Sequence, residues 1–144
     1  MGNDLFIVII GCGRLGSHLA NNLSRTGHAV VVVDSKEEAL GNLSAEYSGF
    51  RVQGDATELA VLKQAKADKA DVVIATTRDD NVNLMVVQVA RKVFSVARVL
   101  ARVFDPSRKP IYRQLGVESI CPTSMAGDVF LETIAIPGSL GDQG

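Results

Sequence analysis

The sequence lacks most of the features that mark secreted, metal-binding and membrane-spanning proteins. Its 144 residues include only two cysteines, Cys12 and Cys121, and no tryptophan. Two cysteines cannot form the several disulfides that hold small secreted domains together. The longest wholly apolar run, Leu5–Ile10, has six residues, whereas a helix that spans a bilayer needs roughly 20. Because no secretory signal pattern precedes that run, we expect a reduced, cytoplasmic setting.

An excess of one charge is also missing. The chain has 15 basic and 16 acidic side chains, for a net charge of −1, so no overall field attracts it to nucleic acid. Locally, seven basic residues stand between Arg91 and Arg113 against a single acid, Asp105. This stretch is either a solvated basic edge or a surface for phosphates or an acidic partner. His18 and His28 have no cluster of ligand-type residues beside them, so we expect no metal site and no catalytic triad.

What the sequence does contain is a regular alternation of short apolar runs with helix-length segments. The runs are rich in β-branched residues, which favours buried strands. They are Leu5–Ile10, Ala29–Val33, Phe50–Gln53, Val72–Thr76, Val99–Val103 and Ser119–Cys121. The alternation predicts an α/β fold of the Rossmann-like, doubly wound kind, with a six-stranded, mostly parallel sheet and helices on both faces. We expect one domain over residues 1–135 and a flexible, glycine-rich tail or linker over residues 136–144.

One predicted helix is apolar on two sides. It extends over Asn81–Phe94, and Leu84, Val87 and Phe94 lie away from the stripe that would face the sheet at 100° per residue. We interpret this second patch as a subunit contact, the alternative being scattered surface apolar residues. Asp79 is expected to cap this helix, and Thr57 the helix after the third strand.

The segment GCGRLG places glycines at positions 11, 13 and 16, directly after the first strand and at the start of a helix. In this spacing Gly11 permits a tight turn, Gly13 lets the backbone approach a pyrophosphate, and Gly16 lets the helix pack close to the strand. Free N–H groups at the helix start favour a phosphate. The alternative is a turn that binds nothing. Arg14 either neutralises a phosphate, of its own ligand or of one held by a neighbouring subunit, or is an ordinary surface arginine.

Further candidate residues follow the later strands. Asp34 ends the second strand, 18 residues after Gly16, where an acid accepts hydrogen bonds from ribose hydroxyls, and its charge favours NAD or a plain adenosine nucleotide over NADP. Ligands of open parallel sheets lie beyond the carboxyl ends of the strands. We therefore place Asp55 and Ala56 beside adenine, and Thr76 and Thr77 beside the phosphates or the second nucleoside. Each of these could instead be only a turn or cap residue.

Together these motifs resemble the TrkA-N family, the nucleotide-binding N-terminal lobe of proteins that regulate potassium conductance. The resemblance covers Phe6 to about Thr133 and rests on IIGCGRLGSHLA, VVVVD, VQGDAT, ADVVIATTRDDNVNLMVVQVAR, VLARVFDP and LGVESICPTSMAG. It implies that Arg102 completes the pocket. The predicted nucleotide-binding set is Gly11, Cys12, Gly13, Arg14, Leu15, Gly16, Asp34, Ser35, Asp55, Ala56, Thr76, Thr77 and Arg102, although a small packed residue is the simpler interpretation of Cys12.

The resemblance also implies a function. It predicts a non-catalytic sensor that binds NAD(H), ATP, ADP or AMP, forms a homodimer or larger ring, and acts on an integral-membrane potassium transporter or channel at the inner face of the membrane. Full-length gating subunits usually carry a further C-terminal lobe, so we expect this chain to be either an excised domain or a one-lobe protein. A small NAD-dependent oxidoreductase and an assembly module with a vestigial pocket are the alternatives. An oxidoreductase would need a substrate domain with a positioned acid or base, for which the chain has little room.

Overall fold

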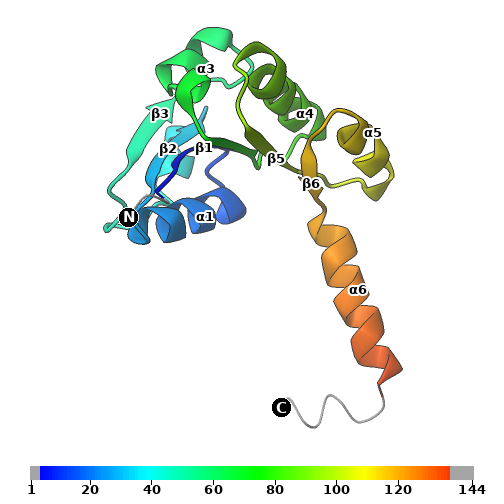
Figure 1. Cartoon of the computed structure of the whole chain (residues 1–144). Coiled ribbons are helices and arrows are strands. Elements are labelled where there is room, and N and C mark those ends of the chain that lie inside the picture. The colour runs from blue at the N-terminus through cyan, green and yellow to red at the C-terminus, as the bar shows by residue number, and fades with distance from the viewer. Residues whose placement is uncertain (1–3, 137–144) are drawn as a thin grey trace.

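The computed structural model describes residues 4–136, which fold around one six-stranded sheet (Figure 1). All five strand pairings are parallel, in the order β3-β2-β1-β4-β5-β6. The strands are β1 (Phe6–Ile10), β2 (Ala29–Asp34), β3 (Phe50–Gln53), β4 (Val72–Ala75), β5 (Arg98–Arg102) and β6 (Glu118–Ile120). This order is that of the dinucleotide-binding doubly wound fold. The predicted fold is confirmed, and each predicted strand end is right to within one residue.

Helices cover both faces of this sheet (Figure 1). The α-helices are α1 (Arg14–Arg25), α2 (Glu37–Leu40), α3 (Leu59–Gln64), α4 (Asp80–Gln88), α5 (Lys109–Gln114) and α6 (Pro122–Ala135). Three short turns complete the set, the 3-10 turns η1 (Ala67–Lys69) and η3 (Pro106–Arg108) and the π-helical turn η2 (Val89–Val93). Buried residues of α1 and α2 join one core cluster, and those of α3, α4 and α5 join the other. The sheet is therefore the middle of three layers.

The central strands are buried on both sides, which explains their unbroken apolar sequence. Ile7–Ile10 of β1 and Val30–Val33 of β2 are all buried. Successive side chains of a strand point to opposite faces, so both faces of a covered strand must be apolar. Burying one such side chain contributes roughly 1.5–3 kcal/mol. This rigid centre fixes the positions at which β1, β2 and β4 end.

Two predictions about helices need correction. Val87 is fully buried in the chain's own core, so it is not available to a subunit contact, whereas Leu84 and Phe94 are half-buried against the same cluster and the contact stays a prediction for them. The Phe94 N–H donates to the Val89 carbonyl oxygen five residues back, at 3.1 Å, so regular 100° spacing does not hold at this end. Thr57 does not cap α3, which begins at Leu59 after Glu58. The Asp79 cap of α4 is confirmed, since its side chain accepts from two backbone N–H groups.

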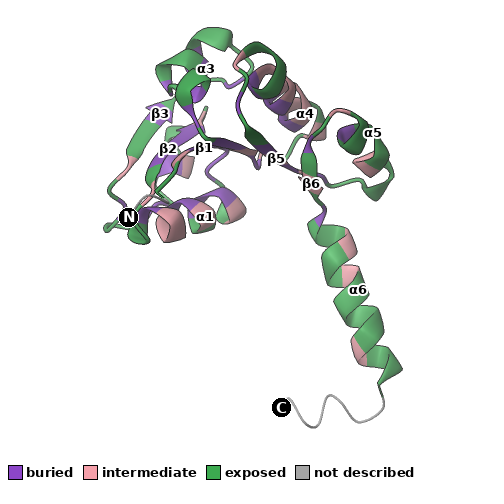
Figure 2. Cartoon of the chain, viewed as in Figure 1, coloured by how far each residue is buried: buried purple, intermediate pink, exposed green. Residues whose placement is uncertain are grey.

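The last helix, α6, extends away from the rest of the molecule (Figure 1) and is coloured as exposed or intermediate throughout (Figure 2). None of its residues is buried. Of the predicted tail, all but Ile136 lies outside the described residues. Among residues 4–136, no helix combines the length and the apolar character that a membrane crossing requires.

Candidate functional site

A cleft of about 850 Å³ opens at the carboxyl ends of the strands, beside the neighbouring strands β1 and β4, between which the strand order reverses. In doubly wound sheets this switch point is the place where ligands bind. The cleft brings together ten of the predicted residues, namely Gly11, Gly13, Arg14, Asp34, Ser35, Asp55, Ala56, Thr76, Thr77 and Arg102. These come from the ends of five strands and from the loops that follow them. Side chains far apart in the sequence therefore converge on one space, as the sequence predicted.

The three glycines of the loop meet different constraints. Gly11 has φ +101°, a left-handed conformation, and a Cβ there would lie 3.0 Å from the Thr76 Oγ1. A Cβ on Gly16 would overlap the Gly11 carbonyl oxygen, so α1 could not approach β1 as closely. Gly13 differs, because a Cβ there would meet nothing within 4 Å. Packing inside the protein therefore explains Gly11 and Gly16 but not Gly13, which faces open space at the start of α1.

Asp34 is tied to the glycine loop by its carboxylate. One oxygen accepts from the Cys12 N–H at 2.8 Å, and the other accepts from the Lys36 N–H at 2.9 Å. An ionised carboxylate can accept about four hydrogen bonds, so two positions stay open toward the cleft that Asp34 lines. The Asn42 side chain donates to the Cys12 carbonyl at 2.9 Å and holds the loop from the α2 side. The carboxylate is thus oriented before any ligand arrives.

At the end of β3, Asp55 and Ala56 have separate roles. The Asp55 carboxylate accepts from the Thr57 N–H at 2.8 Å and from the Thr57 hydroxyl at 2.7 Å, and these bonds lower the pKa of Asp55. Ala56 is buried and belongs to the core cluster beneath the sheet. Its methyl group packs inward, so Ala56 borders the cleft mainly through its backbone.

Thr76 and Thr77 form hydrogen bonds with other residues of the domain. The buried Thr76 hydroxyl lies 3.0 Å from the Ile10 carbonyl oxygen and 3.1 Å from that of Gly11. Asn83, which is fully buried, accepts from the Thr77 N–H at 2.9 Å and from its hydroxyl at 2.6 Å. The Asn83 amide also donates to the carbonyls of Thr77 and Arg102, at 3.0 Å each. Sequence reasoning missed Asn83, although an asparagine on the apolar face of a predicted helix was a usable clue.

Three arginines line the cleft, one of which was not predicted as a site residue. Arg14 lies exposed at the start of α1, and Arg78 lies exposed in the loop after β4. Arg102 at the end of β5 donates to the Thr77 carbonyl at 3.0 Å, and its guanidinium lies 4.5 Å from the centre of the Phe104 ring. The other six basic residues between Arg91 and Arg113 do not line the cleft.

Three predicted residues lie outside the lining, namely Cys12, Leu15 and Gly16. Cys12 is a buried member of the α1-side core, as the simpler interpretation proposed. Burial, together with the nearby Asp34 charge, raises the pKa of the Cys12 thiol to about 11. The side chain is therefore a neutral packing group, and its backbone N–H is what contacts the site.

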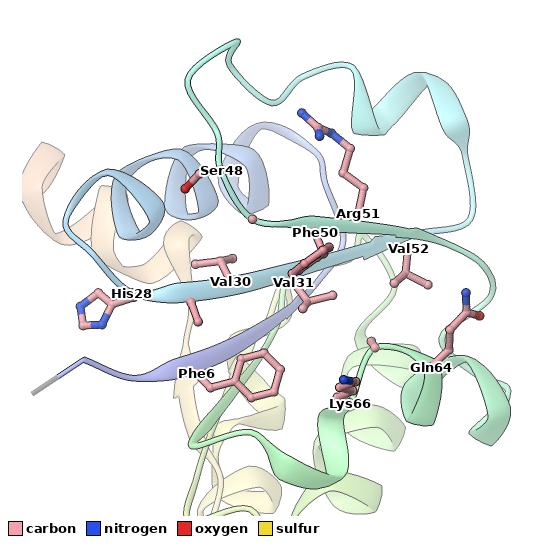
Figure 3. Close-up of a pocket in the computed structure, with 13 residues that line it drawn as sticks. Phe6, His28, Val30, Val31, Ser48, Phe50, Arg51, Val52, Gln64 and Lys66 are labelled. Atoms are coloured by element: carbon pink, nitrogen blue, oxygen red, sulfur yellow. The ribbon is translucent and has the colours of Figure 1, made fainter.

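A second, smaller hollow of about 430 Å³ lies near the opposite, amino-terminal ends of β1 to β3 (Figure 3). Its walls are largely apolar and include Phe6, Val31, Phe50 and Val52. None of the predicted binding residues borders it. Because ligands of this fold bind at the carboxyl ends of strands, with convergent polar groups, the larger cleft is the candidate site.

The sheet order, with the glycine turn after β1 and the acid at the end of β2, defines a Rossmann-like, doubly wound domain. The chain belongs to the TrkA-N domain family, which matches over residues 7–122. It is 34% identical over 135 residues to the Trk system potassium uptake protein TrkA of Streptomyces coelicolor, covering 94% of this chain and 60% of that protein. The chain thus spans about three fifths of the length of the curated relatives that it matches.

Two solved structures of the GsuK channel resemble this fold at 27% sequence identity and a TM-score of 0.77. The one bound to NAD is matched over 91% of this chain and 23% of that chain. The one bound to ADP is matched over 90% of this chain and 34% of that chain.

Proposed function

We propose that this chain is a regulatory domain that binds an adenine nucleotide or NAD(H) and transmits its presence to a potassium transport system. The proposal depends on one observation. Gly13 faces open space, and in the same cleft the Asp34 carboxylate is already oriented by a hydrogen bond from the Cys12 N–H. The family membership and the nucleotides bound by the GsuK structures support it.

The cleft residues fit such a ligand. The backbone at Gly13 and the first turn of α1 would hold phosphates, helped by the Arg14 charge. The open acceptor positions of Asp34 would take the ribose hydroxyls. Ser35 and Asp55, which line the cleft, would border the adenine, and Thr77 and Arg102 would border the other end of the ligand. A volume of about 850 Å³ lies within the range of about 300–1,000 Å³ usual for small-molecule sites.

A sensor role agrees better with this lining than an oxidoreductase role. Within the described residues, the side chains that border the cleft include no histidine or tyrosine that could move a proton during hydride transfer. The Asp55 and Asp79 carboxylates already accept backbone N–H groups. A bound nucleotide then acts as a signal, and it can bias two states of an assembly only by binding them unequally, typically by about 1–3 kcal/mol.

We further propose that the domain works as a homodimer or larger ring in the cytoplasm, at the inner face of the membrane, on an integral-membrane potassium transporter or channel. The apolar residues of α6 support the assembly, since Met125, Val129, Phe130, Leu131 and Ile134 are all exposed. Such a helix is normally covered by another surface. On β6, Ile120 is also exposed, so a second copy would bury apolar surface on both chains.

The nucleotide proposal is tested by calorimetric titration of the purified chain with NAD, NADH, ATP and ADP. We expect binding of at least one of them, with unequal affinities or different small-angle scattering profiles. Asp34→Ala should weaken binding by at least about 1 kcal/mol, because it removes charge-assisted hydrogen bonds. Glu37→Ala is the matched control, since Glu37 is an exposed acid on α2 outside the cleft lining.

Experiments on the same purified chain distinguish the two alternative functions from a sensor. Reduction of NAD with a panel of alcohols and hydroxy acids, abolished by Gly13→Ala, would favour the oxidoreductase. An assembly module with a vestigial pocket would release no small molecule on heating and would show no thermal shift with any adenine nucleotide. Equal affinities and identical scattering profiles for all four nucleotides would contradict a sensor.

A further inference from the structure

The smaller hollow at the amino-terminal ends of β1, β2 and β3 exists because α3 is short. This helix has six residues, so it is only about 9 Å long, whereas α1 on the other face has twelve. The end of α3 and the residues after it, Gln64 and Lys66, lie across the hollow from the strands (Figure 3). The face of the sheet that α3 leaves uncovered is therefore hollowed rather than flat.

Apolar side chains form the walls of this hollow. They belong to Phe6, Val31, Phe50, Val52 and Ala65. Successive side chains of a strand alternate between faces, so Phe50 projects to the same side as Val52, which belongs to the core on the α3 side. Phe50 is nevertheless 75% exposed, although it lies on an edge strand, where charged side chains are usual. The volume of about 430 Å³ suits a small molecule with an apolar body.

The ionisable residues that line the hollow are all basic, namely His28, Arg51 and Lys66. The Arg51 side chain projects to the other side of β3 (Figure 3), where its guanidinium lies 5.1 Å from the centre of the Tyr47 ring. The His28 Nδ1 accepts from the Leu5 N–H at 3.0 Å, so the ring N–H is at Nε2. Lys66 is therefore the cation that stands beside the apolar walls.

Lys66 is positioned by the turn that ends α3. Its N–H donates to a carbonyl oxygen in the last turn of that helix at 2.9 Å, and its backbone is left-handed, with φ 61°. The side chain is exposed and forms no ion pair within residues 4–136. Asp4, Asp68 and Asp71 lie outside the lining, and the Asp71 carboxylate accepts from the N–H at the start of β1 at 2.8 Å. The hollow thus combines apolar walls with an unpaired ammonium group at its edge.

From this arrangement we infer that the hollow is a second ligand site, which takes a small carboxylate with an apolar chain. The walls would bury the chain, and the carboxylate would lie at the edge beside Lys66, where water still reaches both charges. A cationic ligand would meet the Lys66 charge with no acid in the lining to offset it. The hollow and the larger cleft share no lining residue, so this site is separate from the proposed nucleotide site.

Octanoate, an eight-carbon carboxylate, is the probe that tests the site. Its binding is followed through the backbone amide signals of the isotope-labelled chain in NMR. We expect millimolar octanoate to shift the signals of Val31, Phe50 and Ala65 and to leave that of Gly13, in the larger cleft, in place.

A change of charge at Lys66 tests recognition of the carboxylate. Lys66→Met keeps an unbranched apolar stem and loses the charge, so it should weaken octanoate about threefold or more and change the affinity for uncharged 1-octanol by less than about 1.5-fold. Lys69→Met is the matched control, because Lys69 is exposed in the adjoining turn η1 and lies outside the lining.

A change in the wall tests where the chain lies. Phe50→Ala should weaken octanoate and 1-octanol alike, with the thermal midpoint of each variant measured alongside, whereas Ile111→Ala, at an exposed apolar residue on α5, should weaken neither. The site is overturned if octanoate shifts no signal of the lining, if Lys66→Met weakens both ligands equally or neither, or if Phe50→Ala leaves both unchanged. Nucleotide titration decides the proposed function separately.

Discussion

At the scale of single residues, the same amino acid is needed in the GCGRLG loop for different reasons. Gly11 is fixed by its positive φ, and Gly16 by the close approach of α1 to the Gly11 carbonyl. Gly13 has ordinary extended backbone angles, φ −77° and ψ −156°, and open space beside it. Folding therefore accounts for two of the glycines, and the proposed nucleotide would account for the third.

This difference predicts opposite effects of two alanine substitutions. Gly16→Ala should lower the free energy of unfolding by about 2 kcal/mol or more, because the new methyl group forces α1 away from β1. Gly13→Ala should change it by less than about 1 kcal/mol and should weaken nucleotide binding about tenfold or more, since the methyl group projects toward the phosphates. Urea denaturation and calorimetry measure the two quantities. Equal losses of stability in both variants would contradict the assignment.

At the scale of elements, the loop between β4 and α4 is held by the side chain of Asn83. This fully buried amide joins the backbone of Thr77 at the end of β4 to that of Arg102 at the end of β5. The same loop carries Arg78 and the Asp79 cap of α4. The far wall of the cleft is thus positioned by hydrogen bonds from inside the domain.

Asn83→Ala should therefore cost about 3 kcal/mol of unfolding free energy, since several buried polar groups lose their partners at about 1–3 kcal/mol each. Asn81→Ala is the matched control on the same helix. Asn81 is exposed and accepts one bond, from Arg108 at 2.7 Å, so we expect a change of less than about 0.5 kcal/mol. Similar midpoints for both variants in urea denaturation would refute the role given to Asn83.

The pairing of β5 with β6 predicts a pH effect. Two hydrogen bonds from Arg98, at 2.8 and 3.1 Å, lower the pKa of Glu118. A carboxylate whose pKa is lowered on folding stabilises the fold above its unfolded pKa, and this contribution is lost as the pH falls through the folded value. In an NMR titration, Glu118 should titrate below its ordinary value, and Arg98→Gln should raise that pKa. Arg25→Gln should leave it unchanged, and the opposite pattern would show that the pair does not form in solution.

At the scale of the whole molecule, α6 is the element that one chain leaves uncovered. Phe130 and Ile134 are 69% and 77% exposed, whereas large apolar side chains of a monomer are mostly inside. Of the three residues that the sequence assigned to a subunit contact, Val87 is fully buried in the chain's own core, and Leu84 and Phe94 are half-buried. The proposed assembly surface therefore centres on α6, whose apolar side chains are more exposed.

Charged substitutions on α6 test this surface. Phe130→Asp and Ile134→Asp should convert a dimer into a monomer in sedimentation velocity, with little loss of the fold, because neither side chain contributes to the core. Glu132→Gln changes a charge on the same helix without altering its apolar residues, so the dimer should persist. A wild-type chain that sediments as a monomer at high micromolar concentration would rule α6 out as the contact.

The sequence alone predicted most of this architecture, because a strand that is buried on both faces is an unbroken run of apolar residues. It also predicted ten residues that border the cleft, since loops after parallel strands must meet at one edge of the sheet. It did not predict the buried role of Asn83 or the position of Arg78. The role of Asn83 depends on which turn of α4 faces β5, and the position of Arg78 depends on the path of the loop after β4. The periodicity of apolar residues specifies neither of them.

The sequence by itself thus determined the doubly wound fold, the glycine turn and the acid at the end of β2, because these follow from local spacing. Only the tertiary structure showed that a side chain would fit at Gly13 without a clash, whereas Gly11 and Gly16 must be glycine for the chain to fold as it does. Only the structure showed that Arg78 lines the same cleft as Arg102. The physical reason is that steric space and the lining of a cleft arise between segments distant in the chain, so they exist only once the sheet has set where its strands end.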